Sequence, residues 1–315
     1  MEKNFIYSDS NKRYHTYNYF LKEKFSCKVA KLSLNAGFSC PNLDGSKGFG
    51  GCTYCSDSGS GDFAGNVQQS IFQQIQEQKI IMQKKWKNCK FIAYFQARTN
   101  TYAPLPKLKE IFEPVLEIPD IVGISIATRA DCLDAEKADY LAELSKKTFL
   151  EVELGLQSVF DSTGERINRC HSYAEFLQGY NLLKERNIPV CIHIINGLPG
   201  ENYEMMMETV RQVALLKPNS VKIHLLHIIK NTVLAKQWEN FEFKAMDFDE
   251  YISLLCDQLE ILPAEIVIQR VTGDGDRKTL LAPLWSMDKK KVMNSIDLEM
   301  VRRNSYQGIK AQNLK

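Results

Sequence analysis

The chain has 315 residues, of which 44% are hydrophobic and 25% are charged, and its formal net charge is +2. This composition is typical of a soluble globular protein with one large domain or two modest ones. No apolar run approaches the ~20 residues that span a bilayer, and the first thirty residues are too polar for a signal peptide. We therefore expect a cytoplasmic protein with no membrane partner. Its nine cysteines are an odd number, which favours reduced thiols or metal ligands over disulfides.

Basic residues are concentrated at the two ends of the chain. Residues 1–36 carry seven Lys and Arg against three Asp and Glu, and residues 286–315 have the same counts. Each end is therefore +4, and the remainder of the chain is −6. In residues 11–25 aromatic side chains are interspersed with basic ones, a mixture that can bind phosphates and bases. The alternative, which we favour, is a solvated amphipathic helix whose tyrosines pack inward.

Short β-rich runs alternate with amphipathic helical stretches. Six strands are predicted, at 28–35, 90–95, 121–127, 149–156, 189–195 and 220–226. Helical periods fill the gaps, at 67–86, 105–117, 134–147, 173–186, 202–216 and 247–260, with Asp134, Ser172 and Asp247 as N-cap residues. The pattern predicts an α/β core with a parallel sheet at 27–262, between an N-terminal extension at 1–26 and a C-terminal extension at 263–315.

The fourth predicted strand indicates that one face of the sheet is polar. Along it Val152, Leu154 and Leu156 alternate with Glu151, Glu153 and Gln157. A doubly covered sheet would be apolar on both faces, and a closed eight-stranded barrel would fill its lumen with branched side chains. The residues that can be aligned with this polar face are Gln96, Ser125, Arg129, His193 and His224. A six-stranded, incompletely closed barrel with a wet interior accommodates the set, although each histidine alone is more simply a satisfied structural group.

Residues that carry chemistry follow every predicted strand. The segments are Cys40 to Cys55, QARTNTYAP at 96–104, TRADC at 128–132, QS at 157–158, NGLPGE at 196–201 and HIIKNT at 227–232. In βα folds, ligands bind at the C-terminal ends of the strands, where all six segments lie. The convergence predicts one large ligand site.

The first of these segments, CPNLDGSKGFGGCTYCS at 40–56, holds three cysteines. Cys52 and Cys55 have C-x2-C spacing, and the glycine-rich residues before them let Cys40 join the same metal centre. A structural zinc site needs a fourth ligand, and Cys132 is the other cysteine expected within reach. Three thiolates with an open position favour a catalytic centre, while the spacing alone does not decide between zinc and an iron–sulfur cluster.

With the sequence around it, this segment resembles the radical S-adenosylmethionine superfamily, specifically the YhcC/YtqA-type group related to the catalytic subunit of Elongator. The resemblance runs over nearly the whole chain and implies a partial (β/α)6 TIM-like barrel. Eleven residues separate the first two cysteines, more than in the commonest signature of the superfamily, and Cys170 stands where glycine is expected. The motifs are KVAKLSLNAGFSCPNLDGSKGFGGCTYCS, YFQARTNTYAP, GISIATRADCL, VELGLQS, INRCHS, INGLPGE, VKIHLLHIIKNT and VTGDGDRKTLLAPLWS.

The resemblance implies that Cys40, Cys52 and Cys55 hold a [4Fe–4S] cluster whose fourth iron binds S-adenosyl-L-methionine. Reductive cleavage would give a 5′-deoxyadenosyl radical that abstracts hydrogen from the substrate. The other residues implied at the cofactor are Tyr54, Asn196, Gly197 and Pro199 near the adenine, Gln96 and Asn100 near the methionine end, Glu153, Gln157 and Ser158 near the ribose or methionine portion, and Arg169 at the carboxylate.

The substrate is defined less sharply than the cofactors. The relationship to Elongator points to modification of the wobble uridine of transfer RNA, and the basic ends are compatible with a polyanion. An external electron donor of the flavodoxin or ferredoxin type is expected. The alternatives are a radical enzyme that acts on a small molecule or a protein side chain, and a zinc-stabilised nucleic-acid-binding protein.

Overall fold

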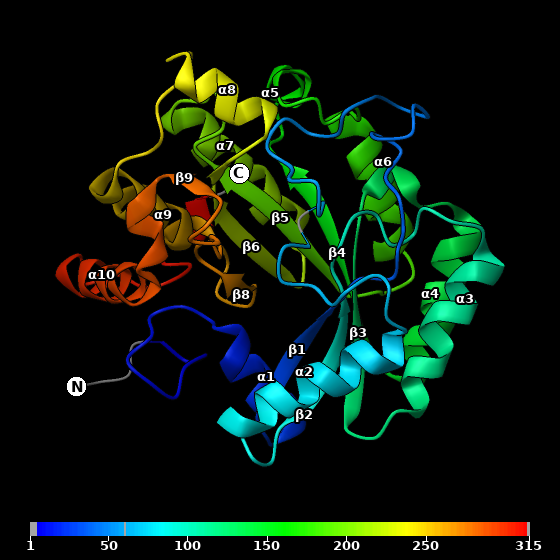
Figure 1. Ribbon diagram of the computed structural model, residues 1–315. Helices are drawn as coiled ribbons and strands as arrows, with labels where there is room; N and C mark the ends of the chain where they lie inside the picture. The colour runs from blue at the N-terminus through cyan, green and yellow to red at the C-terminus, as the bar shows by residue number, and fades with distance from the viewer. Residues whose placement is uncertain (1–4, 60, 314–315) are drawn as a thin grey trace.

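The computed structural model describes residues 5–59 and 61–313, and at its centre is a curled sheet of parallel strands (Figure 1). Seven strands follow one another in the order β1-β2-β3-β4-β5-β6-β8. Their bounds are Val29–Leu34 (β1), Lys90–Phe95 (β2), Ile121–Thr128 (β3), Phe149–Gln157 (β4), Val190–Asn196 (β5), Ser220–Leu225 (β6) and Val267–Arg270 (β8). Strands β7 (Ile228–Ile229) and β9 (Leu280–Ala282) form a separate antiparallel pair. The sheet is a half-barrel, which confirms the predicted α/β fold with a partial TIM-like barrel.

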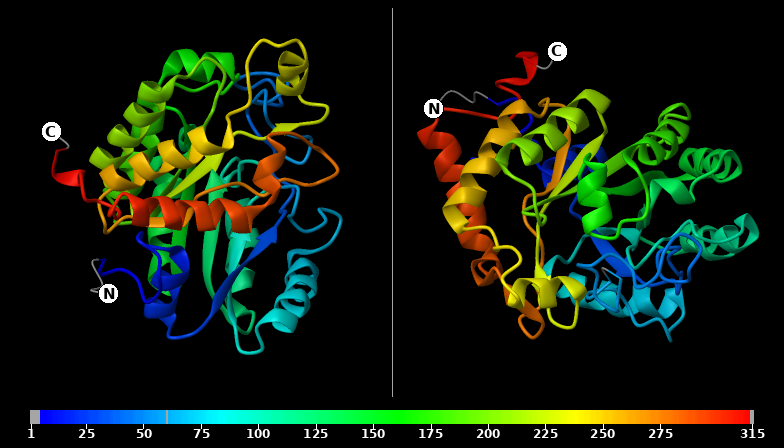
Figure 2. Two further views of the ribbon diagram at one scale, coloured as in Figure 1. Left: turned by 90° about the vertical axis from the view of Figure 1, so that its left-hand side faces the viewer. Right: turned by 90° about the horizontal axis from the view of Figure 1, so that it is seen from above.

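Helices surround the sheet and follow one another around it in chain order (Figure 2). Their bounds are Tyr17–Phe25 (α1), Ile71–Lys85 (α2), Leu105–Phe112 (α3), Ala135–Lys147 (α4), Asp161–Arg166 (α5), Tyr173–Lys184 (α6), Tyr203–Leu216 (α7), Val233–Glu239 (α8), Phe248–Ile261 (α9) and Lys289–Arg302 (α10). The apolar faces of α2, α3, α4, α6, α7, α9 and α10 pack in the main core against the side chains on one face of the strands, such as Val152, Leu154 and Leu156. The opposite face of the sheet therefore lines the interior of the half-barrel.

The structure contains a seventh strand that the sequence analysis missed. Strand β8 lies in the predicted C-terminal extension and pairs in parallel with β6. It is only four residues long, so its signal in the sequence is weak. The C-terminal extension therefore supplies one edge of the main sheet.

All three residues predicted as N-caps occupy the N-cap position of their helix. Asp134 and Ser172 accept hydrogen bonds from the first turns of α4 and α6, as predicted. Asp247 occupies the N-cap position of α9, but its side chain makes no capping bond. Helix α3 ends earlier than predicted, because Pro114 lies near the start of a 3-10 turn at Glu113–Glu117 that follows it.

The N-terminal segment packs against the sheet with its tyrosines turned inward. Tyr14 is buried, and the hydroxyl of Tyr17 lies 3.4 Å from a carboxylate oxygen of Glu151 inside the half-barrel. The favoured interpretation of the basic, aromatic N-terminal stretch is therefore confirmed for these residues. The same segment meets the end of the chain, where the backbone N–H of Gln307 donates to the carbonyl of Arg13 (2.8 Å), so the first and last described segments lie side by side (Figure 2).

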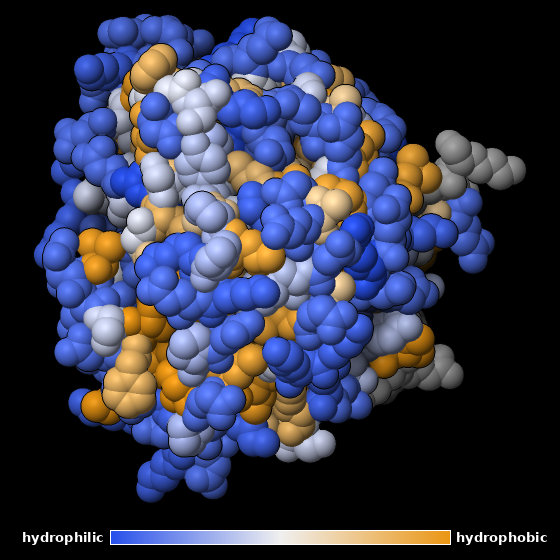
Figure 3. Space-filling view, turned by 90° about the vertical axis from the view of Figure 1, so that its right-hand side faces the viewer, coloured by the Kyte–Doolittle hydropathy of each residue, from blue (hydrophilic) through white to orange (hydrophobic). Residues whose placement is uncertain are grey.

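The surface on the side of α3 and α4 is mostly hydrophilic, with hydrophobic side chains gathered toward its lower part (Figure 3). Exposed apolar residues on α2 include Phe72, Ile80 and Ile81. Among the described helices, none has the length and apolar character needed to cross a bilayer.

Candidate active site

The three cysteines of the sequence motif lie in one loop, residues 35–59, which follows β1 and is called the cysteine loop below. Two tight turns shape it: the backbone N–H of Cys55 donates to the carbonyl of Cys52, and that of Leu43 donates to the carbonyl of Cys40 (both 2.9 Å). Gly50 and Gly51 adopt positive φ angles of 77° and 76°, which glycine tolerates at little cost. The local sequence thus folds the chain back so that Cys40 approaches the C-x2-C pair.

The cysteine loop is fixed over the C-terminal ends of the strands by contacts with several other loops. Thr53 lies at the centre: its N–H donates to the carbonyl of Ile167 (3.0 Å), and its carbonyl accepts from Leu234 at the start of α8 (2.9 Å). Further contacts are Thr99 N–H to the carbonyl of Ser39 (3.3 Å), Lys47 Nζ to Asp131 (3.5 Å), and the side chain of Asn168 to the carbonyls of Phe49 (3.0 Å) and Gly51 (2.7 Å). Segments from four strand ends therefore position the thiols.

The three thiols are half-buried and electrostatically coupled. Burial, and after it the neighbouring Cys55, raises the pKa of Cys52 to about 12, with Cys40 contributing in the same direction. Cys132, buried after β3, has Cys40 among the groups that raise its pKa, so it lies near the site as predicted. Within residues 5–59 and 61–313, no three His, Cys, Asp or Glu side chains are arranged to hold a single metal ion.

Arg129 is the cation beside this site. It lowers the pKa of Cys52, and it donates to the carbonyl of Arg169 (2.8 Å) and, through two nitrogens, to the carboxylate of Asp131 (both 2.9 Å). The sequence analysis aligned Arg129 with the polar face of the sheet, but the structure places it at the strand ends next to the cysteine loop. A fixed guanidinium there favours the thiolate form of the sulfurs.

Two of the residues expected near the methionine end of the cofactor follow β2. The side-chain amide of Asn100 donates to the carbonyls of Phe95 (3.1 Å), Ala97 (3.1 Å) and Ala127 (2.9 Å), whereas its buried Oδ1 has no partner among the described residues. Gln96 donates its backbone N–H to the carbonyl of Leu34 (3.1 Å). Asn100 therefore holds the β2 and β3 ends together and leaves one buried acceptor unused.

Arg169, Gln157 and Ser158 converge at the end of β4. The guanidinium of Arg169 is buried and donates to the carbonyls of Leu156 (2.8 Å), Ser158 (2.6 Å) and His171 (2.9 Å), and it also pairs with Asp161 (3.2 Å). Gln157 has a φ of 63° at a bulge, and the hydroxyl of Ser158 donates to Glu201. Most of the donors of Arg169 are thus used to hold the protein backbone.

The NGLPGE segment closes the end of β5. The side-chain amides of Asn196 and Gln258 bond reciprocally at 2.8 and 2.9 Å, and both residues are buried. Gly197 has a φ of 84°, and a Cβ there would find space, so the backbone angle is what favours glycine. Pro199 is also buried, on the loop that follows. Tyr54 of the cysteine loop packs against the apolar cluster that contains the neighbouring Leu198.

Glu153 lies deeper, in a polar cluster inside the half-barrel that we call the lumen cluster: Lys31, Ser125, Glu151, Glu153, His193 and Lys222. One carboxylate oxygen of Glu153 contacts Lys31 (2.5 Å) and Ser125 (2.9 Å), and the other contacts Lys222 (2.5 Å) and His193 (2.8 Å). Burial alone would raise the pKa of Glu153, but Lys222 and Lys31 hold it well below its usual range. The structure therefore confirms a polar interior in which Ser125, Glu151, Glu153 and His193 form one network.

His193 of the lumen cluster lies next to a second histidine, His224 of β6. The rings of His193 and His224 lie 5.3 Å apart at a 47° angle. Burial lowers the pKa of both, and the nearby Lys222 lowers that of His193 further. Both imidazoles are therefore neutral near pH 7 and line the interior as uncharged polar groups.

The sequence analysis missed the two lysines of the lumen cluster and the asparagines of the cysteine loop. Lys222 lies two residues before His224 on β6 and therefore on the same face of the strand. The period-2 argument that found the histidine would also have found the lysine. Asn42 is fully buried and reaches both Cys52 and the carbonyl of Asn168. No local pattern identifies Asn42, because its partner is distant in sequence.

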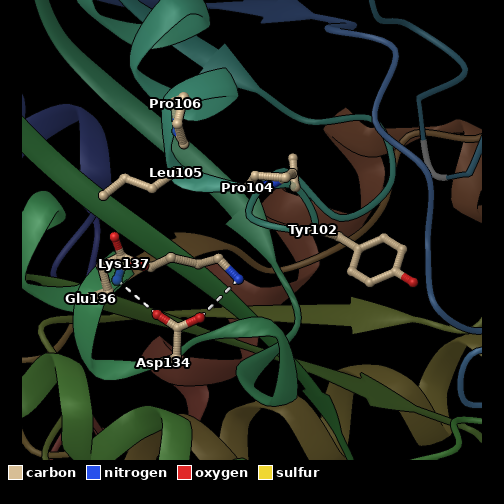
Figure 4. Close-up of a pocket in the computed structure, with 8 residues that line it drawn as sticks. Tyr102, Pro104, Leu105, Pro106, Asp134, Glu136 and Lys137 are labelled. Carbon is tan, nitrogen blue, oxygen red and sulfur yellow. Dashed lines mark hydrogen bonds and ion pairs between the residues drawn. The ribbon is translucent and has the colours of Figure 1, made fainter.

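A surface pocket of about 500 Å³ lies beside the starts of α3 and α4 (Figure 4). Asp134 faces Lys137 across part of it, with Oδ2 and Nζ 3.0 Å apart, and Leu105 and Pro106 line the other side. Tyr102 joins the pocket to the cysteine loop through a 2.6 Å hydrogen bond with Ser46. None of the three motif cysteines lines this pocket.

Comparison with known proteins gives consistent matches along the whole chain. The model of the Radical SAM superfamily matches residues 48–213, and that of the Radical_SAM C-terminal domain matches residues 218–302. Protein YtqA of Bacillus subtilis is 51% identical over 304 residues, which are 96% of this chain and 94% of that protein. Protein YhcC of Escherichia coli is 35% identical over 280 residues, covering 88% and 89%.

The more distant matches include one enzyme whose name states an action on transfer RNA. The tRNA uridine(34) acetyltransferase of Methanocaldococcus infernus is 27% identical over 156 residues, which are 49% of this chain and 29% of that enzyme. The solved structure of archaeal Methanocaldococcus infernus Elp3 superposes with a TM-score of 0.67 at 18% identity, covering 89% of this chain and 64% of that one. This last likeness shows a shared fold. Because the superfamily model matches more than half of the chain, at residues 48–213, and two relatives above 30% identity cover most of its length, the chain belongs to the radical S-adenosylmethionine superfamily, whose enzymes use a [4Fe–4S] cluster and S-adenosylmethionine.

Proposed function

We propose that Cys40, Cys52 and Cys55 are the three protein ligands of the [4Fe–4S] cluster, and that the enzyme acts on a uridine of transfer RNA, at the wobble position. The observation that carries the first part is the convergence of three coupled thiols in one loop fixed over the strand ends. An electron donor of the flavodoxin or ferredoxin type, in the cytoplasm, belongs to the same proposal.

The residues of the site fit these cofactors. The pKa of Cys52 stays raised to about 12 even with Arg129 lowering it, so this thiol ionises near pH 7 only beside a further strong cation, which the irons of a cluster would supply. A four-iron cluster is larger than one ion, and its ligand sulfurs stand correspondingly further apart than those around a zinc. The unused Oδ1 of Asn100 is a buried acceptor suited to the ammonium group of S-adenosylmethionine.

When bound, the cluster and S-adenosylmethionine supply one-electron cleavage and hydrogen-atom abstraction. The chain's own residues orient the reactants and exclude water. Tyr54 and its apolar neighbours seal the space beside the cysteine loop, and Arg169 fixes the end of β4. Below them the lumen cluster offers lysine, carboxylate and imidazole groups to a polar substrate.

Anaerobic reconstitution tests the cluster assignment. Wild-type protein should bind about four irons per chain, and Cys55→Ala should bind markedly less while keeping its circular-dichroism spectrum. The matched control is Cys132→Ala, which removes a neighbouring thiol that the proposal leaves out of the ligand set. The assignment would be contradicted if Cys55→Ala kept its full iron content, or if Cys132→Ala lost iron while Cys55→Ala did not.

Transfer RNA as substrate is supported by the likeness to a tRNA uridine(34) acetyltransferase and by the basic C-terminal segment. Deletion of the gene should change the nucleoside profile of bulk tRNA at a modified uridine, and the reconstituted enzyme should reverse the change in vitro. An unchanged profile would remove this part of the proposal.

One observation favours the alternative of a small-molecule or protein substrate. The aromatic residues of the basic N-terminal stretch, such as Tyr14 and Tyr17, pack into the protein and are not available for stacking on bases. Measuring tRNA binding at increasing salt distinguishes a tRNA substrate from a small-molecule or protein substrate, because contacts with phosphates weaken steeply as salt rises. Absence of salt-dependent binding would favour the alternative.

A further inference from the structure

The loop between β8 and β9, residues 271–279, gathers cations around a single carboxylate. Asp274 accepts from Arg270 through Oδ2 (3.0 Å) and from Lys289, the first residue of α10, through Oδ1. Within the described parts of the chain, Asp274 is the sole hydrogen-bond or ion-pair partner of both cations. Burial, and after it Arg270, lowers the pKa of Lys289 to about 8, which is the response of an ammonium that is partly desolvated beside another cation.

Polar atoms without partners lie at the same loop. Nε2 of His227 and Oγ1 of Thr272 are buried, and neither has a hydrogen-bond partner among residues 5–59 and 61–313. A Cβ on Gly273 would come within 2.8 Å of the ring of His227, so glycine lets the loop lie directly on the imidazole. Two buried polar groups without partners are costly to a fold and are typical of a site that a ligand completes.

Further lysines lie near the β8–β9 loop, at positions where their charge does not stabilise the fold. Lys289, Lys290 and Lys291 form the first turn of α10, where the helix dipole disfavours cations. Lys230 is held beside the loop by a 3.0 Å hydrogen bond to the carbonyl of Lys278. Cations kept at an unfavourable helix end are better explained by an anionic ligand than by stability.

The loop also adjoins the candidate active site. Arg270 is the register partner of Lys222, which belongs to the lumen cluster. On the other side, Ile228 of β7 and Ala282 of β9 pack in the same apolar cluster as Tyr54 of the cysteine loop. A ligand held by this loop would therefore lie at the rim of the half-barrel, between the lumen cluster and the cysteine loop.

We propose that Arg270, Lys289 and His227, with the β8–β9 loop, form a binding site for a phosphate group of the substrate, and that Asp274 occupies this site in the substrate-free protein. A carboxylate is the nearest side-chain equivalent of a phosphate oxygen pair, and guanidinium groups bind both in the same bidentate geometry. Because Asp274 is exposed and lies between two glycines, its loop can move away when a phosphate arrives. The further claim that this phosphate belongs to a nucleotide of tRNA rests on the proposed function.

The test compares binding of tRNA, uridine 5′-monophosphate and uridine to cluster-loaded, full-length variants. Arg270→Gln should weaken binding of tRNA and of the monophosphate about tenfold. It should also reduce the slope of log affinity against log salt for tRNA by about one. Asp274→Asn should strengthen both, because it frees two cations from their internal competitor. The matched control is Asp276→Asn, which makes the same charge change two residues away, where the carboxylate accepts only from its own loop.

The outcomes separate this inference from the proposed function. If tRNA does not bind the wild type but the monophosphate binds more tightly than uridine and responds to both variants, the phosphate site stands and the tRNA substrate fails. If tRNA binds and neither Arg270→Gln nor Asp274→Asn differs from Asp276→Asn, the phosphate site is overturned and the tRNA substrate stands. If neither ligand binds, both fail.

Discussion

The side-chain amide of Asn42 lies 3.6 Å from the sulfur of Cys52 and donates at the same time to the carbonyl of Asn168. Asn42 is fully buried, and the glycine at position 48 lies directly over it, because a Cβ there would come within 2.4 Å of Asn42 Oδ1. One amide thus ties a proposed cluster ligand to the segment that follows α5. Hydrogen bonds to ligand sulfurs stabilise the reduced, more negative state of an iron–sulfur centre.

We expect Asn42→Leu to lower the reduction potential of the reconstituted cluster by roughly 60 mV, the one-electron equivalent of a single charge-assisted hydrogen bond. Potentiometric titration followed by electron paramagnetic resonance measures the shift. The control is Asn35→Leu, which removes an amide from the same loop where its Oδ1 accepts from Gly37 (3.1 Å). Equal potentials in wild type and Asn42→Leu would exclude the contact with the sulfur.

Cys170 has a left-handed backbone with a φ of 58°, a conformation that favours glycine. The resemblance predicted glycine at this position, and the structure explains the preference physically. We expect Cys170→Gly to raise the free energy of unfolding by about 1 kcal/mol relative to Cys170→Ala, because both remove the sulfur but only the first relieves the strain. Urea unfolding of the two variants measures the difference. Equal stabilities would mean that the residue carries no backbone strain.

The sequence predicted the fold well where elements repeat and less well at the edges. Six strands follow from alternation and spacing, since each has a helix before or after it that sets the period. Strand β8 escaped because it is four residues long. The helix at 17–25 was the favoured interpretation of a charged stretch, but its bounds were not predicted, because its inward tyrosines need the sheet as a partner.

The three cysteines of the candidate site could be picked out from the sequence, whereas the contacts that support their loop could not. The three cysteines stand out through spacing alone, whereas Asn42 and Lys31 acquire meaning only from partners more than a hundred residues away. Arg169 shows the converse case. Its sequence context suggested a ligand for the cofactor carboxylate, while its observed partners are mostly backbone carbonyls. Local patterns identify reactive residues, and long-range packing decides how the others are used.

Glu153 neutralises two buried lysines, Lys31 and Lys222. We expect Glu153→Gln to lower the free energy of unfolding by roughly 3 kcal/mol at pH 7, because it leaves the buried ammonium of Lys222 without a counter-charge, whereas Lys31 keeps its ion pair with Glu151 (3.0 Å). Chemical denaturation measures the loss. The control is Glu143→Gln on the surface of α4, where the ion pair with Lys146 is exposed and the expected change is below about 1 kcal/mol. A loss as small as that of the control would contradict the role of Glu153.

The same carboxylate predicts a pH dependence. Lys222 and Lys31 hold the pKa of Glu153 well below its ordinary value of 4.5, against the effect of burial. Its contribution is therefore complete above pH 4.5 and is lost as the pH falls through the lower value reached in the folded protein. The stability difference between wild type and Glu153→Gln should shrink progressively below pH 4.5. A difference that stays constant down to pH 3 would rule out this titration.

Arg169 is expected to stabilise the end of β4 before it contributes to any cofactor contact. In Arg169→Lys a single ammonium replaces a planar group that donates to Leu156, Ser158 and His171, so buried carbonyls lose their donors. We expect a loss of roughly 2 kcal/mol or more in the free energy of unfolding, measured without cofactors. Asp161→Asn is the control, because it removes the ion pair at a half-exposed carboxylate and leaves the carbonyl bonds in place. If Arg169→Lys keeps wild-type stability but binds S-adenosylmethionine more weakly, the guanidinium acts on the cofactor and its backbone contacts are secondary; if stability falls and affinity in the reconstituted protein is unchanged, it is a positioning residue for β4.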